Sequence, residues 1–207
     1  MTVAKRLLLA TRNDGKVREL RTLLSDLPLM LIDLGQVGLV NDVAETGETF
    51  AENAVLKASG YAAQTGLLAL ADDSGLEVDA LGGAPGVRSA RYIGKEAPDA
   101  ERIERLLTQV AALEHPKRTA RFISVIAIAS PDGMVLSTSM GICDGRIAFT
   151  ARGANGFGYD PVFVPNGYNL TFAELDTDTK NSISHRSQAL NNARNFLKTL
   201  TGTSSAR

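Results

Sequence analysis

The chain has 207 residues, 44% of them hydrophobic, and a formal net charge of -1 at neutral pH. This length is enough for one large domain or two small lobes. The near balance of acids and bases argues against binding of nucleic acid or a membrane surface through bulk charge. The single cysteine, Cys143, excludes an internal disulfide and leaves too few thiolates for a zinc or iron–sulfur site.

Apolar runs in the sequence are short. No run approaches the about 20 residues that a membrane-spanning helix needs. The apolar part of the N-terminal segment is shorter than that of a signal peptide, because Arg12 interrupts it. The sequence therefore predicts a cytoplasmic protein with no membrane partner.

The N-terminal segment predicts a strand, a loop and a helix. Residues 5–10 are predicted to form a buried strand, because consecutive leucines show no alternation. Residues 11–16 form the predicted loop, and a helix begins near Val17. This arrangement aims backbone N–H groups at an anion, and Arg12 and Lys16 would add positive charge. The alternative is an ordinary turn with a solvated lysine, since the glycine spacing of the P-loop is absent.

A second strand and a well-marked helix follow. Residues 29–34 are predicted to form the strand. Thr49 and Glu52 fit a capping box that starts a helix running to about Gln64. Lys57 lies on this predicted helix, but an exposed helical lysine is usually solvated, so it supports no assignment by itself.

Two adjacent acids end the next apolar run. Residues 67–71 predict a buried strand, Asp72 and Asp73 follow it, and Ser74 and Gly75 are predicted to turn the chain. Carboxylates at a strand end suit a hard cation such as Mg²⁺, which usually takes one or two of them. An ordinary turn is equally consistent with this stretch, since Asp and Ser before Gly are common turn formers.

Further elements are predicted in the second half of the chain. A helix is predicted at residues 99–110. Two strands, residues 122–129 and 135–142, are predicted to form an antiparallel hairpin. A last helix is predicted at residues 185–200, with Ser184 as its N-cap.

Two features of the C-terminal part indicate a ligand. Phe157 and Tyr159 stand among glycines in residues 153–163, where aromatic rings can stack on a nucleobase; the alternative is an aromatic plug that closes the core. His185 and Arg186 begin the last predicted helix. Cations are mildly unfavourable there, because a helix N-terminus carries partial positive charge. Their presence is explained if an electron-rich group binds beside them.

Together these motifs resemble those of the inosine triphosphate pyrophosphatase family. The resemblance covers residues 7–197, and it rests on seven motifs in the same order. In this sequence they are Thr11-Arg12-Asn13-Asp14-Gly15-Lys16, Glu45-Thr46-Gly47 with Phe50-Ala51-Glu52-Asn53-Ala54 and Lys57, Asp72-Asp73-Ser74-Gly75-Leu76, Gly83-Ala84-Pro85-Gly86, Ser89-Ala90-Arg91-Tyr92, Gly156-Phe157-Gly158-Tyr159-Asp160-Pro161, and Ser184-His185-Arg186.

The resemblance implies an elongated, two-lobed α/β fold around a long curved mixed β-sheet. Residues 1–200 would form a single domain with a central nucleotide cleft, and residues 201–207 a frayed tail. The implied assembly is a homodimer without a nucleic acid partner. The implied enzyme is a nucleoside-triphosphate pyrophosphatase, which needs Mg²⁺ and hydrolyses ITP, dITP and XTP to the monophosphate and pyrophosphate. Such an enzyme cleanses the nucleotide pool.

The resemblance also assigns the site residues. Asp73 would be the general base and, with Asp72 and Glu45, a metal ligand. Crowded like charges raise the pKa of a carboxylate, and a bound cation lowers it again. Substrate-binding roles fall on Thr11, Arg12, Asn13, Asp14, Gly15, Lys16, Lys57, Ser74, Phe157, Gly158, Tyr159, Asp160, Lys180, His185 and Arg186.

Base recognition follows from hydrogen-bond chemistry. Hypoxanthine and xanthine carry a 6-oxo acceptor, to which Lys180, His185 and Arg186 can donate, and Phe157 would stack on the ring. Adenine would set donor against donor, at a cost of about 1–3 kcal/mol for each buried group left unpaired. Two alternatives are a pyrophosphatase for modified pyrimidine nucleotides and a nucleotide sensor without catalysis. A sensor would keep the phosphate-binding residues but lack the acids.

Overall fold

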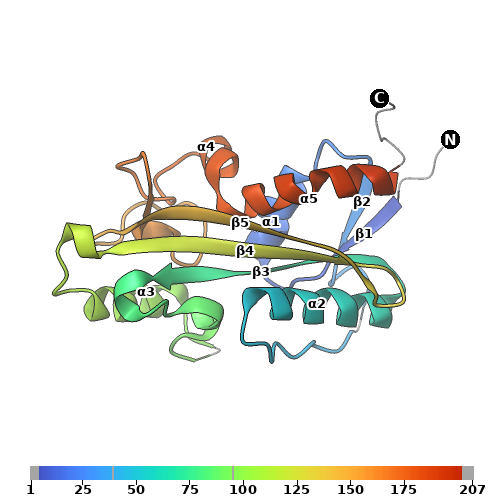
Figure 1. Cartoon of the computed structure of the whole chain (residues 1–207), viewed down its shortest axis with the longest axis horizontal. Helices are drawn as coiled ribbons and strands as arrows, with labels where there is room; N and C mark the ends of the chain where they lie inside the picture. Colours follow the sequence, from blue (N-terminus) through green and yellow to red (C-terminus); the bar gives the residue numbers. More distant parts are fainter. Residues whose placement is uncertain (1–4, 39, 95, 202–207) are drawn as a thin grey trace. The chain divides into compact units, whose positions relative to one another are not determined.

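The computed structural model describes residues 5–38, 40–94 and 96–201 (Figure 1). Within these residues a 6-stranded sheet has the strand order β2-β1-β3-β4-β5-β6. The strands are β1 (Lys5–Leu9), β2 (Leu29–Asp33), β3 (Leu68–Val78), β4 (Thr119–Ala129), β5 (Val135–Ile147) and β6 (Phe163–Pro165). The α-helices are α1 (Asp14–Leu23), α2 (Phe50–Thr65), α3 (Asp99–Gln109), α4 (Thr177–Ile183) and α5 (His185–Thr201).

The chain divides into two compact units. Unit 1 takes in the described residues of Met1–Asp73, Ser124–Gly141 and Arg186–Arg207, and unit 2 takes in those of Ser74–Ile123 and Ile142–His185. That residues 1–200 form a single domain with a central cleft stays a prediction. Most of the predicted tail, residues 202–207, lies outside the described residues.

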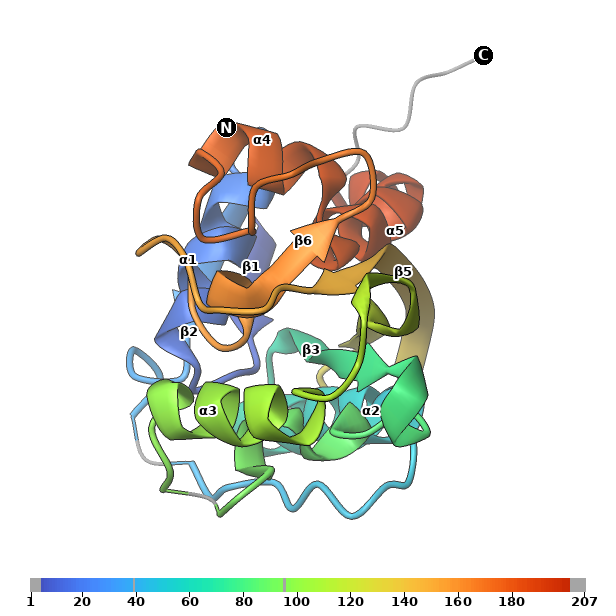
Figure 2. The same ribbon diagram turned by 90° about the vertical axis from the view of Figure 1, so that its left-hand side faces the viewer.

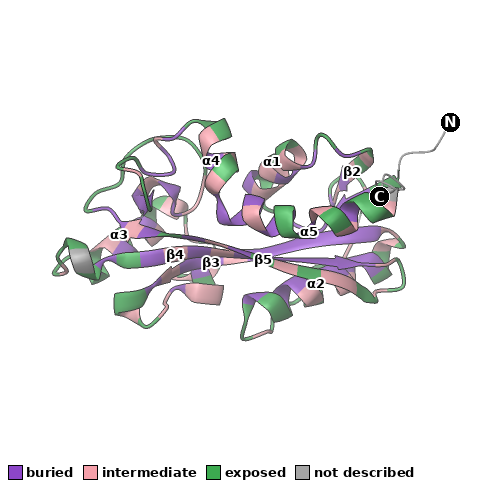
Figure 3. Cartoon of the chain, turned by 45° about the horizontal axis from the view of Figure 1, so that its top comes forward, coloured by how far each residue is buried: buried purple, intermediate pink, exposed green. Residues whose placement is uncertain are grey.

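Unit 1 is built on parallel strands. β1 pairs in parallel with both β2 and β3, and Leu7 is the register partner of Leu31 on one side and Leu68 on the other. Figures 1 and 3 show α1 and α5 on one face of these strands and α2 on the other. The core under α1 and α5 consists of buried aliphatic side chains: Leu7, Leu9, Leu20, Leu24, Leu27, Leu68, Leu70, Ile126, Ile128, Ala189, Leu190, Ala193 and Leu197.

Unit 2 has a core of its own, which is richer in aromatic side chains. Figures 1 and 2 both place α3 and α4 on opposite sides of its strands. β5 and β6 are antiparallel, with Ile147 opposite Phe163. The buried core residues are Leu76, Val78, Ile103, Leu106, Val110, Ala120, Phe122, Cys143, Ile147, Tyr159, Val162, Phe163, Phe172 and Leu175.

The local sequence signals for α2 are confirmed. The Thr49 side chain accepts from the N–H of Glu52, and the Glu52 carboxylate accepts from the N–H of Thr49, which completes the predicted capping box. Gly66 ends the helix with a φ of 64°, a left-handed conformation that glycine adopts without a steric penalty. Among the described residues, no helix combines the length and the apolar character of a membrane span.

The predicted turn after the two acids is wrong. β3 runs without interruption from Leu68 to Val78, so Asp72 and Asp73 lie inside a strand and Ser74 and Gly75 continue it. The physical reason is that cationic side chains neutralise both carboxylates, as described below. The acids therefore do not need to leave the sheet for solvent.

Two helices also differ from their predicted forms. α1 begins at Asp14 rather than near Val17, because the Asn13 side chain accepts from the N–H of Lys16 and caps the first turn. α4 was not predicted. The Asp176 side chain caps α4, but its 7 residues carry no apolar repeat that could reveal a helix.

Candidate functional site

Asp72 is the centre of a buried ionic network in unit 1. The Asp72 side chain is fully buried. Its Oδ2 lies 2.9 Å from Lys16 Nζ and 3.2 Å from Arg186 Nη2, and the Ser124 hydroxyl donates to its Oδ1. Burial alone would raise the pKa of Asp72, but the charges of Arg186 and Lys16 outweigh it and hold the pKa well below the ordinary value of 3.8. Asp72 is therefore ionised in the folded chain.

Arg186 lies in the first turn of α5 and bridges two carboxylates. The Arg186 Nε and Nη2 atoms donate to Asp72 Oδ2, and its Nη1 donates to Glu19 on α1. Arg186 is 1% exposed, so this cation is balanced inside the protein rather than by solvent. That Arg186 also donates to a purine base stays a prediction.

Asp73 has a different environment from Asp72, because successive side chains of a strand point to opposite faces. Lys57, on α2, places its Nζ 2.7 Å from Asp73 Oδ1 and 3.6 Å from Glu45 Oε1, and it also donates to the Asp72 carbonyl. Asp73 Oδ2 is buried and has no hydrogen-bond partner among the described residues. Burial raises the pKa of Asp73, the charges of Lys57 and Lys16 oppose that rise, and Glu45 adds to it.

Asp73 and Glu45 fit a hard cation. A buried carboxylate oxygen without a donor is a suitable ligand, and Mg²⁺ often takes one or two carboxylates and completes its shell with phosphate oxygens. Within the part of the chain that the structure describes, no group of three or more His, Cys, Asp or Glu side chains could hold a metal by itself. Asp72 belongs to the network with Lys16 and Arg186, and its role as a metal ligand stays a prediction.

Asn53 fixes the loop that carries Glu45. Asn53 is fully buried, its Oδ1 accepts from the N–H of Gly47 at 2.8 Å, and its Nδ2 donates to the Gly47 carbonyl at 3.3 Å. A Cβ at Gly47 would lie 2.5 Å from Glu52 Cβ, so the loop approaches α2 more closely than another residue would allow. Asn53 thereby fastens the Glu45 loop to the helix that carries Lys57. No role was predicted for Asn53 from the sequence.

The predicted phosphate loop is the start of α1. Thr11 and Gly15 are buried, and Asn13 caps the helix. The first N–H groups of a helix have no partner within it and favour an anion. Exposed Arg12 donates to Asp42 at 2.5 Å and to the Val40 carbonyl at 3.0 Å. Lys16 points to Asp72, and its burial lowers its pKa.

The predicted substrate-binding residues Phe157, Asp160 and Lys180 meet in unit 2. The buried Asp160 Oδ2 accepts from Lys180 Nζ at 2.6 Å and from the N–H of Phe157 at 2.9 Å. Lys180 Nζ also lies 5.3 Å from the centre of the Phe157 ring. Asp160 therefore positions both the aromatic ring and the ammonium group. Phe157 is half-buried.

Tyr159, His185 and Ser74 have other surroundings. Tyr159 belongs to the core of unit 2, and its hydroxyl donates to the Ser89 carbonyl at 3.2 Å. The plug interpretation thus agrees with the position of Tyr159, and its role in substrate binding stays a prediction. His185 is buried and stacks on Phe122 with ring centres 4.7 Å apart. Ser74 is half-buried within β3.

The sequence model of the Ham1 family matches residues 7–196. The chain belongs to the Ham1 family. It is 49% identical over 195 residues to the dITP/XTP pyrophosphatase of Desulforamulus reducens, covering 94% of this chain and 96% of that one. It is 43% identical over 190 residues to the dITP/XTP pyrophosphatase of Bacillus subtilis, and the match covers 92% of this chain and 96% of that one.

Solved structures give the same relationship. A HAM1 protein from Coxiella burnetii matches with a TM-score of 0.82 and 46% identity, over 96% of this chain and 99% of that one. A protein from Mycobacterium abscessus, described as a nucleoside-triphosphatase / dITP/XTP pyrophosphatase, matches with a TM-score of 0.72 and 42% identity, over 90% and 97%. The predicted family and the predicted mixed α/β fold are confirmed.

Two sets of predicted site residues are distinguished in this Ham1 chain. The acid–cation set of unit 1 contains Lys16, Glu45, Lys57, Asp72, Asp73 and Arg186. The base-side set of unit 2 contains Phe157, Gly158, Asp160, Lys180 and His185. The two sets are adjacent along the chain, where His185 precedes Arg186 and Asp73 precedes Ser74.

Proposed function

We propose that the protein hydrolyses non-canonical purine nucleoside triphosphates, namely ITP, dITP and XTP, to the monophosphate and pyrophosphate. The observation that supports this best is the pair of acids on β3 with its lysines. Asp73 has a buried oxygen without a donor, and Lys16 and Lys57 approach the same stretch of strand. The relatives from Desulforamulus reducens and Bacillus subtilis carry the name dITP/XTP pyrophosphatase. A free nucleotide substrate also agrees with the cytoplasmic location expected from the sequence.

The acid–cation set supplies what the reaction needs at the phosphate end. Hydrolysis requires water to attack the α-phosphorus in line while pyrophosphate leaves, so catalysis depends on positioning and charge stabilisation. Asp73 accepts the proton of this water, and its raised pKa suits a base. Lys57 holds the other Asp73 oxygen in place, and the start of α1 with Lys16 binds the polyphosphate.

Mg²⁺ is the proposed cofactor. Asp73 and Glu45 would hold it, and when bound it neutralises the charge of the polyphosphate. Asn53 keeps Glu45 beside Lys57 and so preserves the spacing of the two acids.

The base-side set selects the purine. Phe157 stacks on the ring, and Lys180 and His185 donate to the 6-oxo group. An adenine amino group would leave such donors unpaired, at about 1–3 kcal/mol for each buried group. A homodimer, as the family resemblance implies, is part of the proposal.

Pyrophosphate release by wild type and Asp73→Asn tests this function. At fixed Mg²⁺ the wild type should prefer ITP and XTP to ATP and GTP, and the variant should lose activity by at least about a hundredfold, within the usual contribution of a general base. Preference for dUTP would support the pyrimidine alternative. Nucleotide binding without turnover would support the sensor. Full activity of Asp73→Asn would remove Asp73 as the base.

A further inference from the structure

The loop that carries Phe157 is held at two consecutive peptide groups. The N–H of Phe157 donates to Asp160 Oδ2 at 2.9 Å, and the N–H of Gly158 donates to Asp99 Oδ2 at 2.7 Å. Gly158 has a φ of 61°, in the left-handed region, so its peptide takes an orientation that other residues rarely adopt. Two carboxylates from different parts of unit 2 therefore fix the peptide on either side of the Phe157 side chain.

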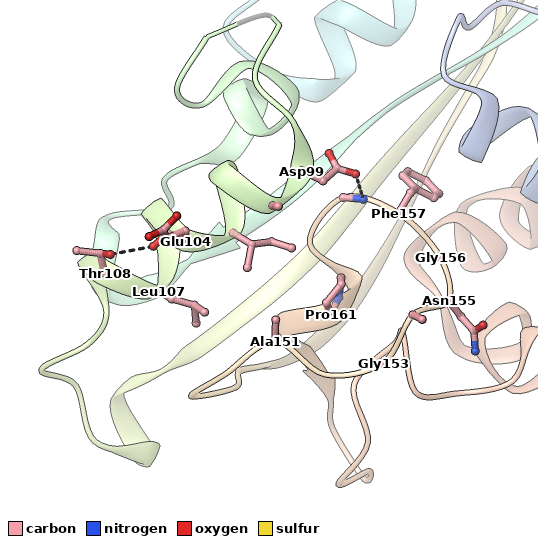
Figure 4. Close-up of a pocket in the computed structure, with 14 residues that line it drawn as sticks. Asp99, Glu104, Leu107, Thr108, Ala151, Gly153, Asn155, Gly156, Phe157 and Pro161 are labelled. Carbon is pink, nitrogen blue, oxygen red and sulfur yellow. Dashed lines mark hydrogen bonds between the residues drawn. The ribbon is translucent and has the colours of Figure 1, made fainter.

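A hollow leaves this loop with little apolar support on the α3 side. The hollow has a volume of about 620 Å³ and lies between α3 and residues 151–161. Figure 4 shows Leu107 and Pro161 on its walls and Asp99 at its rim, while the Phe157 ring projects away from Leu107. Packing density normally holds a side chain or loop in place. Across this space the hydrogen bond from the Gly158 N–H to Asp99 holds the loop instead.

Asp99 is itself anchored. The Arg102 guanidinium donates to Asp99 Oδ1, and Arg102 Nη1 donates to the Ala90 carbonyl at 2.6 Å. A continuous series of contacts thus runs from Ala90 through Arg102 and Asp99 to the peptide of Gly158. The Asp99 carboxylate is committed at both oxygens, which favours a single orientation.

We propose that Asp99 is a positioning residue for recognition of the purine base. Asp160 sets the Phe157 ring beside Lys180, and Asp99 sets the orientation of the next peptide and with it the direction of the ring. Asp99 lies outside the motifs that carry the family resemblance, and no role was assigned to it from the sequence. This inference rests on the proposed function, because it assigns Phe157 to the base of the substrate.

The test compares ligands with and without a base. Asp99→Ala should raise KM for ITP about tenfold, the effect of losing one hydrogen bond to a charged group, while kcat stays within about twofold. Inhibition by inorganic tripolyphosphate, which has no base, should not change. Asp99→Asn retains an acceptor and should restore part of the affinity. Glu101→Ala is the matched control, because Glu101 is the other acid in the first turn of α3.

Several results would overturn the inference. These are an unchanged KM for ITP, a loss confined to kcat, an equal loss of tripolyphosphate affinity, or an equal effect of Glu101→Ala. A second readout does not need catalysis. The chain has no tryptophan, so Phe157→Trp places a unique indole on the loop. Adding Asp99→Ala to this variant should increase quenching of the indole by acrylamide, and unchanged quenching would refute the positioning role.

The second readout also separates this inference from the proposed function. A wild type that releases no pyrophosphate from ITP would refute the function, and the quenching experiment would still decide whether Asp99 positions the loop. If Asp99→Ala does not fold, Asp99→Asn carries both measurements, with smaller changes in the same direction. Unchanged KM and quenching in that variant would overturn the inference.

Discussion

Asp72→Asn would remove the negative charge of a buried carboxylate that pairs with Lys16 and Arg186 and accepts a hydrogen bond from Ser124. Removing one partner of a buried ion pair costs about 3–5 kcal/mol, because the other charge stays buried without compensation. Glu19 still balances Arg186, and burial already lowers the pKa of Lys16, so the charge left buried without compensation is smaller than that of an isolated pair. We therefore expect the lower end of that range, about 3 kcal/mol of unfolding free energy.

Urea unfolding at pH 7, followed by circular dichroism, measures this loss. Asp26→Asn is the matched control, since Asp26 pairs with Arg194 at 2.8 Å in the same unit but its side chain is 57% exposed. An exposed pair contributes about 0–1 kcal/mol. A loss for Asp72→Asn no larger than that of Asp26→Asn would refute the ionic network as a stabilising element.

The pH dependence gives a second check on Asp72. Its pKa is depressed in the folded chain, so its contribution is fully present above the ordinary value of 3.8 and is lost as pH falls toward the folded value. The difference in stability between wild type and Asp72→Asn should therefore shrink as the pH is lowered below about 4. A difference that stays constant on acidification would contradict the depressed pKa.

Further predictions concern Asn53, Arg118 and Asp160. Asn53→Ala should release the Glu45 loop and weaken binding of Mn²⁺, used in place of Mg²⁺ and measured by calorimetry, several-fold. Arg118 is 1% exposed and donates to the carbonyls of Val110, Ile147 and Ala148. Arg118→Met should lower the free energy of unfolding by about 3 kcal/mol, because these buried carbonyls lose their donor. Asp160→Asn should raise KM for ITP and narrow the preference for ITP over ATP, because Lys180 loses its buried partner.

Each of these variants has a more exposed control. Asn195→Ala on α5, Arg121→Met on β4 and Asp178→Asn on α4 change the same residue types at positions with greater solvent access. If a control matched its buried counterpart in metal binding, unfolding free energy or KM, the corresponding prediction would be wrong.

Signals that lie close together in the sequence predicted their elements well. The capping box at Thr49 and Glu52 placed α2 correctly, because both partners lie within one helical turn. The continuation of β3 through Asp72 and Asp73 could not be predicted in the same way. The cations that stabilise Asp72 there lie 56 residues before it, at Lys16, and 114 residues after it, at Arg186. A local pattern cannot contain them, so the turn seemed an equal alternative.

Asp99 could not be predicted from local patterns for the same reason. Asp99 reaches Gly158 across 59 residues, and no motif joins them. Asp160 was identified as a site residue because it belongs to the motif of residues 156–161 that resembles the family, and it accepts from the N–H of Phe157 in the same motif. Asn53 could have been recognised, since it lies one helical turn before Lys57 on a face that proves to be buried.

Side chains alternate between the two faces of β3, and this alternation gives two adjacent aspartates different environments. Asp72 and Asp73 differ by one position, yet the pKa of one is lowered and that of the other is raised, because a strand presents its neighbours to different faces. A shift of the strand by a single residue would turn each acid to the opposite face and put Ala71 or Ser74 into one of the two environments. The region is therefore intolerant of insertions and deletions, although either acid taken alone is an ordinary aspartate. Engineering of this enzyme must therefore keep the length of β3.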